Sequence, residues 1–269
     1  MKMMTAIICL LLSLACSKKG DHPSQGIALS KQFMNNILIS ERTYTADGKV
    51  AKEQNYDEQT GALGYAIEYE YDSYGRLLRE KQFDPGNKPT GIVSYFWKSN
   101  GHLEKHELLS MSGADSGNVT IRVKYAYDTE GRIAKQSWVD LVTDKVSNSR
   151  EMNYYGNNNL KSVVGYYYNA GIAELKYRVE YAPEGDSLLP GLADRGGYII
   201  DFRWPDFVAD KMYYKYYDDA LVTTEMNTLF TNRQYNKQGY LSSQKVTLKK
   251  IKPANPDEVN EYRYEYIEL

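Results

Sequence analysis

One short motif recurs along most of this chain, and it constrains the fold more than any other feature. Its clearest copy, residues 71–77, reads YDSYGRL and follows a segment in which Ile67, Tyr69 and Tyr71 alternate with acidic residues. Alternation with a period of two puts the rings on one face of a β-strand and the carboxylates on the other. Gly75 stands where a tight turn needs a positive φ, which glycine adopts without steric cost. The motif therefore predicts a strand, a turn and a second strand.

Other copies keep an aromatic residue, a turn residue four positions later and, in most cases, an aliphatic residue two positions after that. The turn residues of the copies are Gly48, Gly75, Gly101, Gly131, Asn158, Gly185 and Gly239. Their successive spacings are 27, 26, 30, 27, 27 and 54 residues, so the repeat is about 27 residues long and the last gap is twice that. The doubled gap predicts a divergent copy, for which residues 214–221 are the best match. Two strand-like segments per period predict one β-hairpin per repeat.

We therefore predict an all-β protein of about eight antiparallel β-hairpins, forming one long curved sheet that closes in part into a barrel. The chain has 26 tyrosines against 6 phenylalanines. Tyrosine suits a thin sheet, because its ring packs while its hydroxyl reaches water or a hydrogen-bond partner. The folded body is expected to span residues 31–269 as a single domain.

The first residues predict export. Residues 1–15 have the basic start, the short apolar core and the small final residue that are typical of a cleaved signal peptide. Cys16 follows directly, and this end resembles the lipobox of bacterial lipoproteins. The resemblance implies a lipid anchor at Cys16 and a location at the bacterial outer membrane, and the polar, turn-rich composition of residues 16–30 predicts a flexible tether. The alternative is an ordinary secretory signal with an incidental cysteine.

Composition excludes several classes of function. The net charge is −2, with 33 basic and 35 acidic residues, which argues against a nucleic-acid partner because such proteins carry a basic stripe. Cys9 lies inside the signal peptide, so the mature chain would have no thiol for a disulfide or a nucleophile.

Two copies of the motif carry a family resemblance. Residues 71–77 and 127–133 resemble the YD repeats of the RHS family, whose consensus is Y-D-x-x-G-R-L. The resemblance implies hairpins stacked side by side in a curved sheet. The chain is also similar to small YD-repeat lipoproteins of bacterial envelopes, a group without a general assigned activity.

Candidates for metal binding or catalysis are few. His102, Glu104 and His106 alternate along a predicted strand, and two imidazoles with a carboxylate suit zinc or copper. Side chains at alternate positions of a flat strand lie about 7 Å apart, which is awkward for one ion, so we predict a solvated face and no metal or cofactor. A glycoside hydrolase needs two carboxylates that face each other across a cleft. Paired carboxylates also occur wherever one face of a strand is exposed to water, so their presence in the sequence does not single out a catalytic pair.

Aromatic side chains are better candidates for binding, because rings on a concave sheet can stack on sugars or grip an extended peptide. The candidates are Trp97, Trp138, Trp204 and Phe207, the last two within residues 188–207, which interrupt the repeat. We predict a non-enzymatic binding or scaffolding protein, held to the membrane by its lipid, with a glycan or an envelope protein as partner. Two alternatives remain: a periplasmic carrier that holds a lipid or an outer-membrane polypeptide, and a carboxylate-based glycoside hydrolase.

Overall fold

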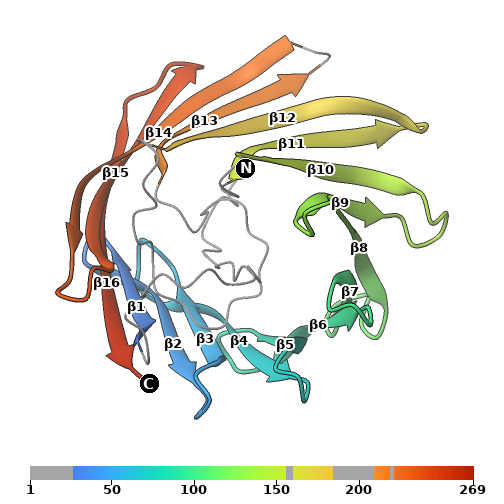
Figure 1. The fold of residues 1–269 in the computed structure, drawn as a ribbon, viewed down its shortest axis with the longest axis horizontal. Helices are drawn as coiled ribbons and strands as arrows, with labels where there is room; N and C mark the ends of the chain where they lie inside the picture. The colour runs from blue at the N-terminus through green and yellow to red at the C-terminus, as the bar shows by residue number, and fades with distance from the viewer. Residues whose placement is uncertain (1–26, 156–159, 184–208, 219–220) are drawn as a thin grey trace.

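The computed structural model describes residues 27–155, 160–183, 209–218 and 221–269, which form a closed antiparallel β-barrel (Figure 1). Its strands follow one another in chain order, and β1 pairs with β16 to close the wall. The strands are β1 (Ile27–Met34), β2 (Ile37–Tyr44), β3 (Val50–Tyr56), β4 (Leu63–Tyr71), β5 (Leu77–Phe83), β6 (Pro89–Trp97), β7 (Leu103–Ser110), β8 (Val119–Tyr127), β9 (Ile133–Val139), β10 (Val146–Tyr154), β11 (Leu160–Asn169), β12 (Ile172–Pro183), β13 (Ala209–Asp218), β14 (Leu221–Tyr235), β15 (Leu241–Lys252) and β16 (Glu258–Glu268).

The predicted all-β fold of antiparallel hairpins is confirmed, and the sheet closes fully. Every second strand pair from β2–β3 to β14–β15, seven in all, matches a motif hairpin, and β16 with β1 makes the closing pair in place of an eighth hairpin. Residues 27–30 belong to β1 and not to the predicted tether, because Leu29 packs against Leu241 and Tyr264.

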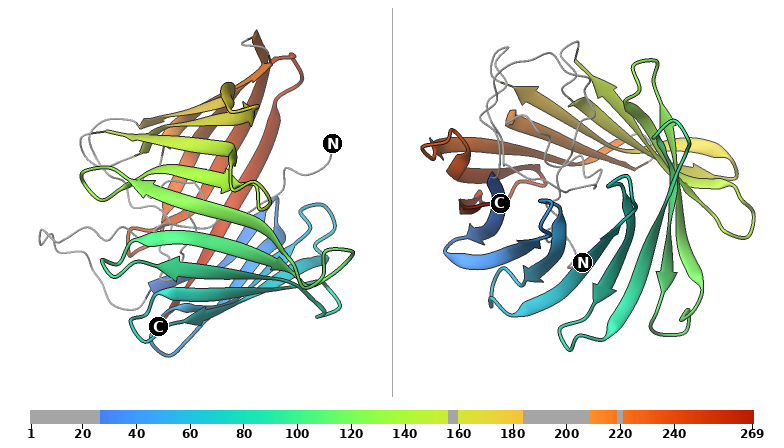
Figure 2. Two further views of the ribbon diagram at one scale, coloured as in Figure 1. Left: turned by 90° about the vertical axis from the view of Figure 1, so that its right-hand side faces the viewer. Right: turned by 60° about the horizontal axis from the view of Figure 1, so that its bottom comes forward.

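The prediction of a divergent motif turn at residues 214–221 is wrong. β13 ends at Asp218 and β14 begins at Leu221, so this connection lies at the end of the barrel away from the motif turns. Strand direction alternates around the wall, which puts every motif turn at one end, here called the motif end. The variable loops lie at the other, here called the far end, and the views of Figure 2 show hairpin loops projecting at both.

In the five motif turns that the structure describes, the residue after the motif aromatic closes the turn through its backbone, at Thr45, Asp72, Lys98, Asp128 and Asn236. In the clearest copy, Asp72 Oδ1 accepts hydrogen bonds from the backbone nitrogens of Tyr74 and Arg76, both at 2.9 Å. Asp72 Oδ2 accepts a further bond from Arg76 Nε at 2.7 Å. Gly75 has a φ of 78°, as the motif predicts. The aspartate therefore sets the turn geometry in the way that an Asx-turn does.

The motif aromatics join neighbouring hairpins. Four of them, together with Tyr266 on β16, donate a hydrogen bond from a polar side-chain atom to the backbone carbonyl of the motif aliphatic residue in the preceding hairpin. The pairs are Tyr71 to Val50 (2.9 Å), Trp97 to Leu77 (2.7 Å), Tyr127 to Leu103 (3.0 Å), Tyr154 to Ile133 (2.8 Å) and Tyr266 to Leu241 (2.6 Å). The residue before each of those aliphatic residues lies against the ring of the same aromatic. We call this combination the inter-repeat latch.

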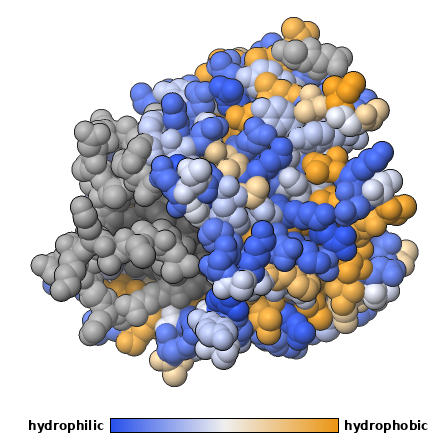
Figure 3. Space-filling view, turned by 45° about the vertical axis from the view of Figure 1, so that its right-hand side comes forward, coloured by the Kyte–Doolittle hydropathy of each residue, from blue (hydrophilic) through white to orange (hydrophobic). Residues whose placement is uncertain are grey.

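The two faces of the wall differ in chemistry. Side chains of one face are mostly buried and form apolar clusters, such as Val50, Ile67, Tyr69 and Leu77. Because side chains converge on the concave side of a closed barrel, this face lines the interior. The outer face carries rows of ion pairs, and hydrophilic side chains cover much of the view in Figure 3.

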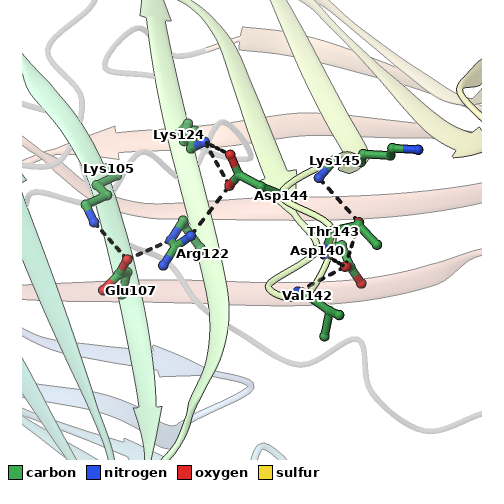
Figure 4. A network of polar contacts seen from close by, with 9 residues as sticks. All are labelled: Lys105, Glu107, Arg122, Lys124, Asp140, Val142, Thr143, Asp144 and Lys145. Carbon is green, nitrogen blue, oxygen red and sulfur yellow. Dashed lines mark hydrogen bonds and ion pairs between the residues drawn. The ribbon is translucent and has the colours of Figure 1, made fainter.

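One outer row shows how these ion pairs cross strands. Glu107 on β7 pairs with Lys105 at 2.9 Å and with Arg122 on β8 at 2.7 Å. Asp144, in the loop before β10, pairs with Lys124 at 3.1 Å and lies 3.6 Å from Arg122 (Figure 4). Such exposed pairs stabilise the sheet modestly and keep its outer surface wet.

Candidate functional site

A row of directly opposed residues crosses the inner wall over six strands. Strand register aligns Gln136 on β9 with Arg150 on β10, and Arg150 with Gly165 on β11. It continues from Gly165 to Tyr177 on β12 and to Tyr216 on β13. At the other end, Tyr125 on β8 lies opposite Gln136. The row therefore brings together polar and aromatic residues that lie far apart in the sequence.

Within this row, an arginine lies between aromatic rings. The guanidinium carbon of Arg150 lies 4.8 Å from the ring centroid of Trp138 and 5.9 Å from that of Tyr177. The rings of Tyr177 and Tyr216 have centroids 6.1 Å apart. All four side chains are partly exposed. We call Trp138, Arg150, Tyr177 and Tyr216 the aromatic–arginine platform.

Gly165 makes the platform possible. A Cβ atom at this position would lie 2.2 Å from Cε1 of Tyr177, which is shorter than any van der Waals contact. The φ of Gly165 is not in the left-handed region, so close approach of the Tyr177 ring is the reason for glycine here. The ring of Tyr177 therefore lies flat across β11, toward Arg150.

A buried polar network continues along the inner wall from the platform. Arg42 and Glu53 form an ion pair at 3.3 Å in which each side chain is 3% exposed. The hydroxyl of Tyr69 donates to Glu53 at 3.1 Å, and that of Tyr95 donates to Glu80 at 2.7 Å. Each of the two carboxylates thus accepts a hydrogen bond from a tyrosine, and such buried contacts fix which residues face each other across strands.

The two acidic groups of this network differ in their surroundings. Burial raises the pKa of Glu80 to about 7, the bond from Tyr95 lowers it in part, and the charge of Glu53 adds to the rise. Glu53 lies beside Arg42. Two carboxyls in unlike environments are the pattern of a general acid with a base or nucleophile. Because Glu53 is only 2% exposed and Glu80 only 4%, neither presents a surface to a sugar, and the pair fits a structural network better than a hydrolase site.

The three candidate metal ligands are not brought together. His102 lies in a motif turn and stacks on Tyr127, with ring centroids 4.1 Å apart and planes 18° apart. Glu104 is exposed, whereas His106 Nδ1 lies 2.7 Å from the Tyr125 hydroxyl inside the barrel. Burial lowers the pKa of His106 to about 4, so its imidazole stays neutral at pH 7. Across the ranges that the structure describes, no group of three His, Cys, Asp or Glu residues could hold a metal ion.

Of the predicted binding residues, the structure places one in the platform and one in an inter-repeat latch. Trp138 belongs to the aromatic–arginine platform, whereas Trp97 donates its Nε1 hydrogen bond within an inter-repeat latch. Trp204, Phe207 and the predicted lipid-anchor residue Cys16 lie outside the described residues.

Sequence reasoning missed three members of the platform, Arg150, Tyr177 and Tyr216. One signal was present. Gly165 is a glycine inside a strand-like segment, immediately before three tyrosines, which indicates a close approach by another group.

Comparison with known proteins supports the fold. No family model matches the chain, and no curated protein matches it. A crystal structure of a porin-like protein from Bacteroides uniformis is similar, with a TM-score of 0.54 and 11% identity, over 88% of this chain and 97% of that one. The TcdB2-TccC3 crystal structure is less similar, with a TM-score of 0.34 and 14% identity, over 87% of this chain and 13% of that one. At 11% identity, the similarity to the porin-like protein shows the barrel fold alone. The described residues include no helix long and apolar enough to cross a membrane.

Proposed function

We propose that this protein is a non-enzymatic envelope protein, anchored by lipid at Cys16, that binds a carbohydrate on the inner wall of its barrel. The observation that carries the proposal is the aromatic–arginine platform. Its three partly exposed rings offer flat apolar surfaces, against which the C–H face of a sugar ring packs. The guanidinium of Arg150 offers several donors in one plane to sugar oxygens.

Anchoring fits this chain better than a porin-like position across the bilayer. A barrel that spans a membrane needs an apolar band on its outer face. The outer face here carries ion pairs in the middle of its wall, among them Lys52 with Glu68 at 3.4 Å and Lys135 with Glu151 at 3.1 Å. Charged side chains at such positions would lie in hydrocarbon, which supports a barrel held beside the membrane.

The carrier alternative fits less well. A carrier for an acyl chain needs an apolar inner wall, whereas the partly exposed guanidinium of Arg150 lies on this wall. Contact between a hydrocarbon chain and a charged guanidinium is unfavourable. Hydroxyl groups of a sugar, in contrast, are compatible with a wall of mixed polar and aromatic side chains.

A screen followed by titration tests the proposal. The full chain, purified in detergent, is applied to a glycan array, and the best saccharide is titrated by calorimetry against wild type, Trp138→Ala and Tyr216→Ala. We expect both variants to bind about tenfold more weakly or worse, because each loses a stacking surface. Phe96→Ala is the matched control, because Phe96 is an exposed ring on the outer face, against Lys105.

The control is expected to bind like wild type. Melting temperatures of all variants are measured in parallel, to separate lost binding from lost folding. An array without any bound saccharide, or full affinity in Trp138→Ala, would overturn the proposed function.

A further inference from the structure

We infer that the saccharide bound at the platform carries a carboxylate, as uronic acids do, and that Arg150 is the residue that selects it. This inference rests on the proposed carbohydrate binding and adds the substrate class.

Arg150 differs from seven of the other arginines that the structure describes. Seven arginines lie within ion-pair distance of a carboxylate: Arg42, Arg76, Arg79, Arg122, Arg132, Arg178 and Arg263. Arg150, by contrast, makes contact with rings, and within the described part of the chain its guanidinium has no hydrogen-bond or ion-pair partner. Its charge is therefore uncompensated on the wall.

The surroundings of Arg150 favour an anion from outside the protein. The guanidinium is partly buried between Trp138 and Tyr177, so it has lost part of its hydration. A charge in such a place gains strongly from a charged hydrogen-bond partner. The planar fork of arginine matches a carboxylate through two parallel hydrogen bonds, which a neutral hydroxyl cannot reproduce.

The described strands around the platform do not supply this carboxylate. Glu174 at the start of β12 lies opposite Tyr167, two positions along β11 from Gly165. Glu174 is already paired with Lys176 at 3.3 Å. On β10, Glu151 follows Arg150 but points to the outer face, where it pairs with Lys135. Both carboxylates near the platform are thus engaged elsewhere.

The aromatic rings of the platform indicate which kind of molecule carries the carboxylate. A free inorganic anion would need only the guanidinium, whereas the ligand here must also cover Trp138, Tyr177 and Tyr216, which lie on both sides of Arg150. A pyranose ring that bears a carboxylate offers both parts, a C–H face for the rings and an anion for Arg150. Substrates of this class include oligomers of galacturonic acid.

The test compares two probes that differ only in the carboxylate. A galacturonic acid tetramer and the galactose tetramer of the same linkage are titrated by calorimetry into the full chain, at low and at high salt. We expect wild type to bind the acidic tetramer about tenfold or more tightly than the neutral one, and high salt to weaken the acidic one selectively.

Variants at Arg150 separate charge from stacking. Arg150→Gln is expected to lose about tenfold or more in affinity for the acidic tetramer and to leave the neutral affinity nearly unchanged. Arg150→Lys keeps the charge without the fork and is expected to fall between the two. Arg178→Gln is the matched control, because Arg178 is exposed and pairs with Glu180.

Each other outcome overturns the inference. Equal affinity for both tetramers, with no effect of Arg150→Gln, contradicts the acidic ligand and leaves carbohydrate binding intact. Absence of binding by any saccharide refutes both. A carboxylate-ended peptide that binds through Arg150 where neither tetramer binds would also refute both, and would assign the platform to peptides.

Discussion

At the scale of single residues, the motif position before the aliphatic residue is filled by chemically different side chains that make the same contact. Each lies against the aromatic of the next hairpin. The contacts are Lys49 on Tyr71 (5.4 Å), Arg76 on Trp97 (5.7 Å), His102 on Tyr127 (4.1 Å), Arg132 on Tyr154 (4.6 Å) and Tyr240 on Tyr266 (5.7 Å). The position requires a group that packs on a π-face, and His102 meets this requirement as arginine does.

A substitution at His102 tests this role. His102→Ala removes the stacking on Tyr127 and should lower the free energy of unfolding by about 0.5–1.5 kcal/mol. His102→Arg restores the commoner motif residue and should keep the wild-type value. Denaturant midpoints of the three proteins measure the effect. If alanine is tolerated as well as arginine, the contact does not stabilise the fold.

Glu80 makes stability depend on pH. Its pKa is raised from 4.5 to about 7 in the folded state, so the folded protein binds this proton more tightly than the unfolded chain does. The resulting stabilisation is complete below about pH 4.5 and is lost as the pH rises through about 7, by on the order of 3 kcal/mol. Glu80→Gln keeps an acceptor for Tyr95 but cannot ionise. We expect it to be more stable than wild type at pH 8 and similar at pH 4.5.

Unfolding curves between pH 4.5 and pH 8 measure this difference. Subtracting the wild-type curve removes the contribution of His106, whose lowered pKa makes stability fall toward acid pH in both proteins. Glu104→Gln serves as the control, because Glu104 is exposed on β7, and its difference from wild type should not vary with pH. A constant difference for Glu80→Gln would mean that folding leaves the pKa of Glu80 unchanged.

At the scale of the hairpin, the inter-repeat latch is the connection that repeats. Tyr127→Phe removes the hydroxyl that donates to the Leu103 carbonyl and leaves that acceptor with one partner fewer in a partly buried place. We expect a loss of about 1 kcal/mol in the free energy of unfolding. Tyr74→Phe is the control, because Tyr74 is 82% exposed in its turn. Equal stability of the two variants would show that the latch bond contributes nothing beyond ring packing.

Hairpins could be predicted from the sequence, because the information that forms them is local. Asp72 and Gly75 form their turn with residues at most four positions away. Barrel closure depends on distant residues instead. Asn35 Nδ2 donates to Asn260 Oδ1 at 2.8 Å, and Asn35 Oδ1 accepts from the backbone of Glu261 at 2.9 Å. No periodic pattern marks such a pairing, so a partly closed sheet was the most that the repeats indicated.

The platform was beyond prediction for the same reason. Trp138 stood out as a single residue, but its partner Arg150 looked like any other charged residue on a strand. Only the registers of β9 to β13, including a bulge after Gly165, align them with Tyr216. A one-residue slip in any of these pairings would move a member to the outer face.

At the scale of the whole molecule, the distribution of chemistry is the reverse of that in a membrane-spanning barrel. Apolar clusters, such as that of Met152, Val163, Val179 and Phe230, line the interior beside the buried polar network, and exposed ion pairs cover the outside. This arrangement needs water around the wall. Under the proposed function, attachment to a membrane therefore comes from lipid at Cys16.

Removal of the anchor tests this arrangement. Residues 1–15 are replaced by a signal peptide that is cleaved without acylation, and Cys16 is changed to Ser. We expect wild type to stay with the membrane fraction and the variant to appear, folded, in the soluble fraction of the periplasm, because a wall with Lys52–Glu68 and Arg122–Glu107 pairs has no stable place in hydrocarbon. Extraction with alkaline carbonate distinguishes insertion from loose adhesion. A variant that resists extraction would show that the barrel itself enters the bilayer, and the outward ion pairs would then have to face a surface other than lipid.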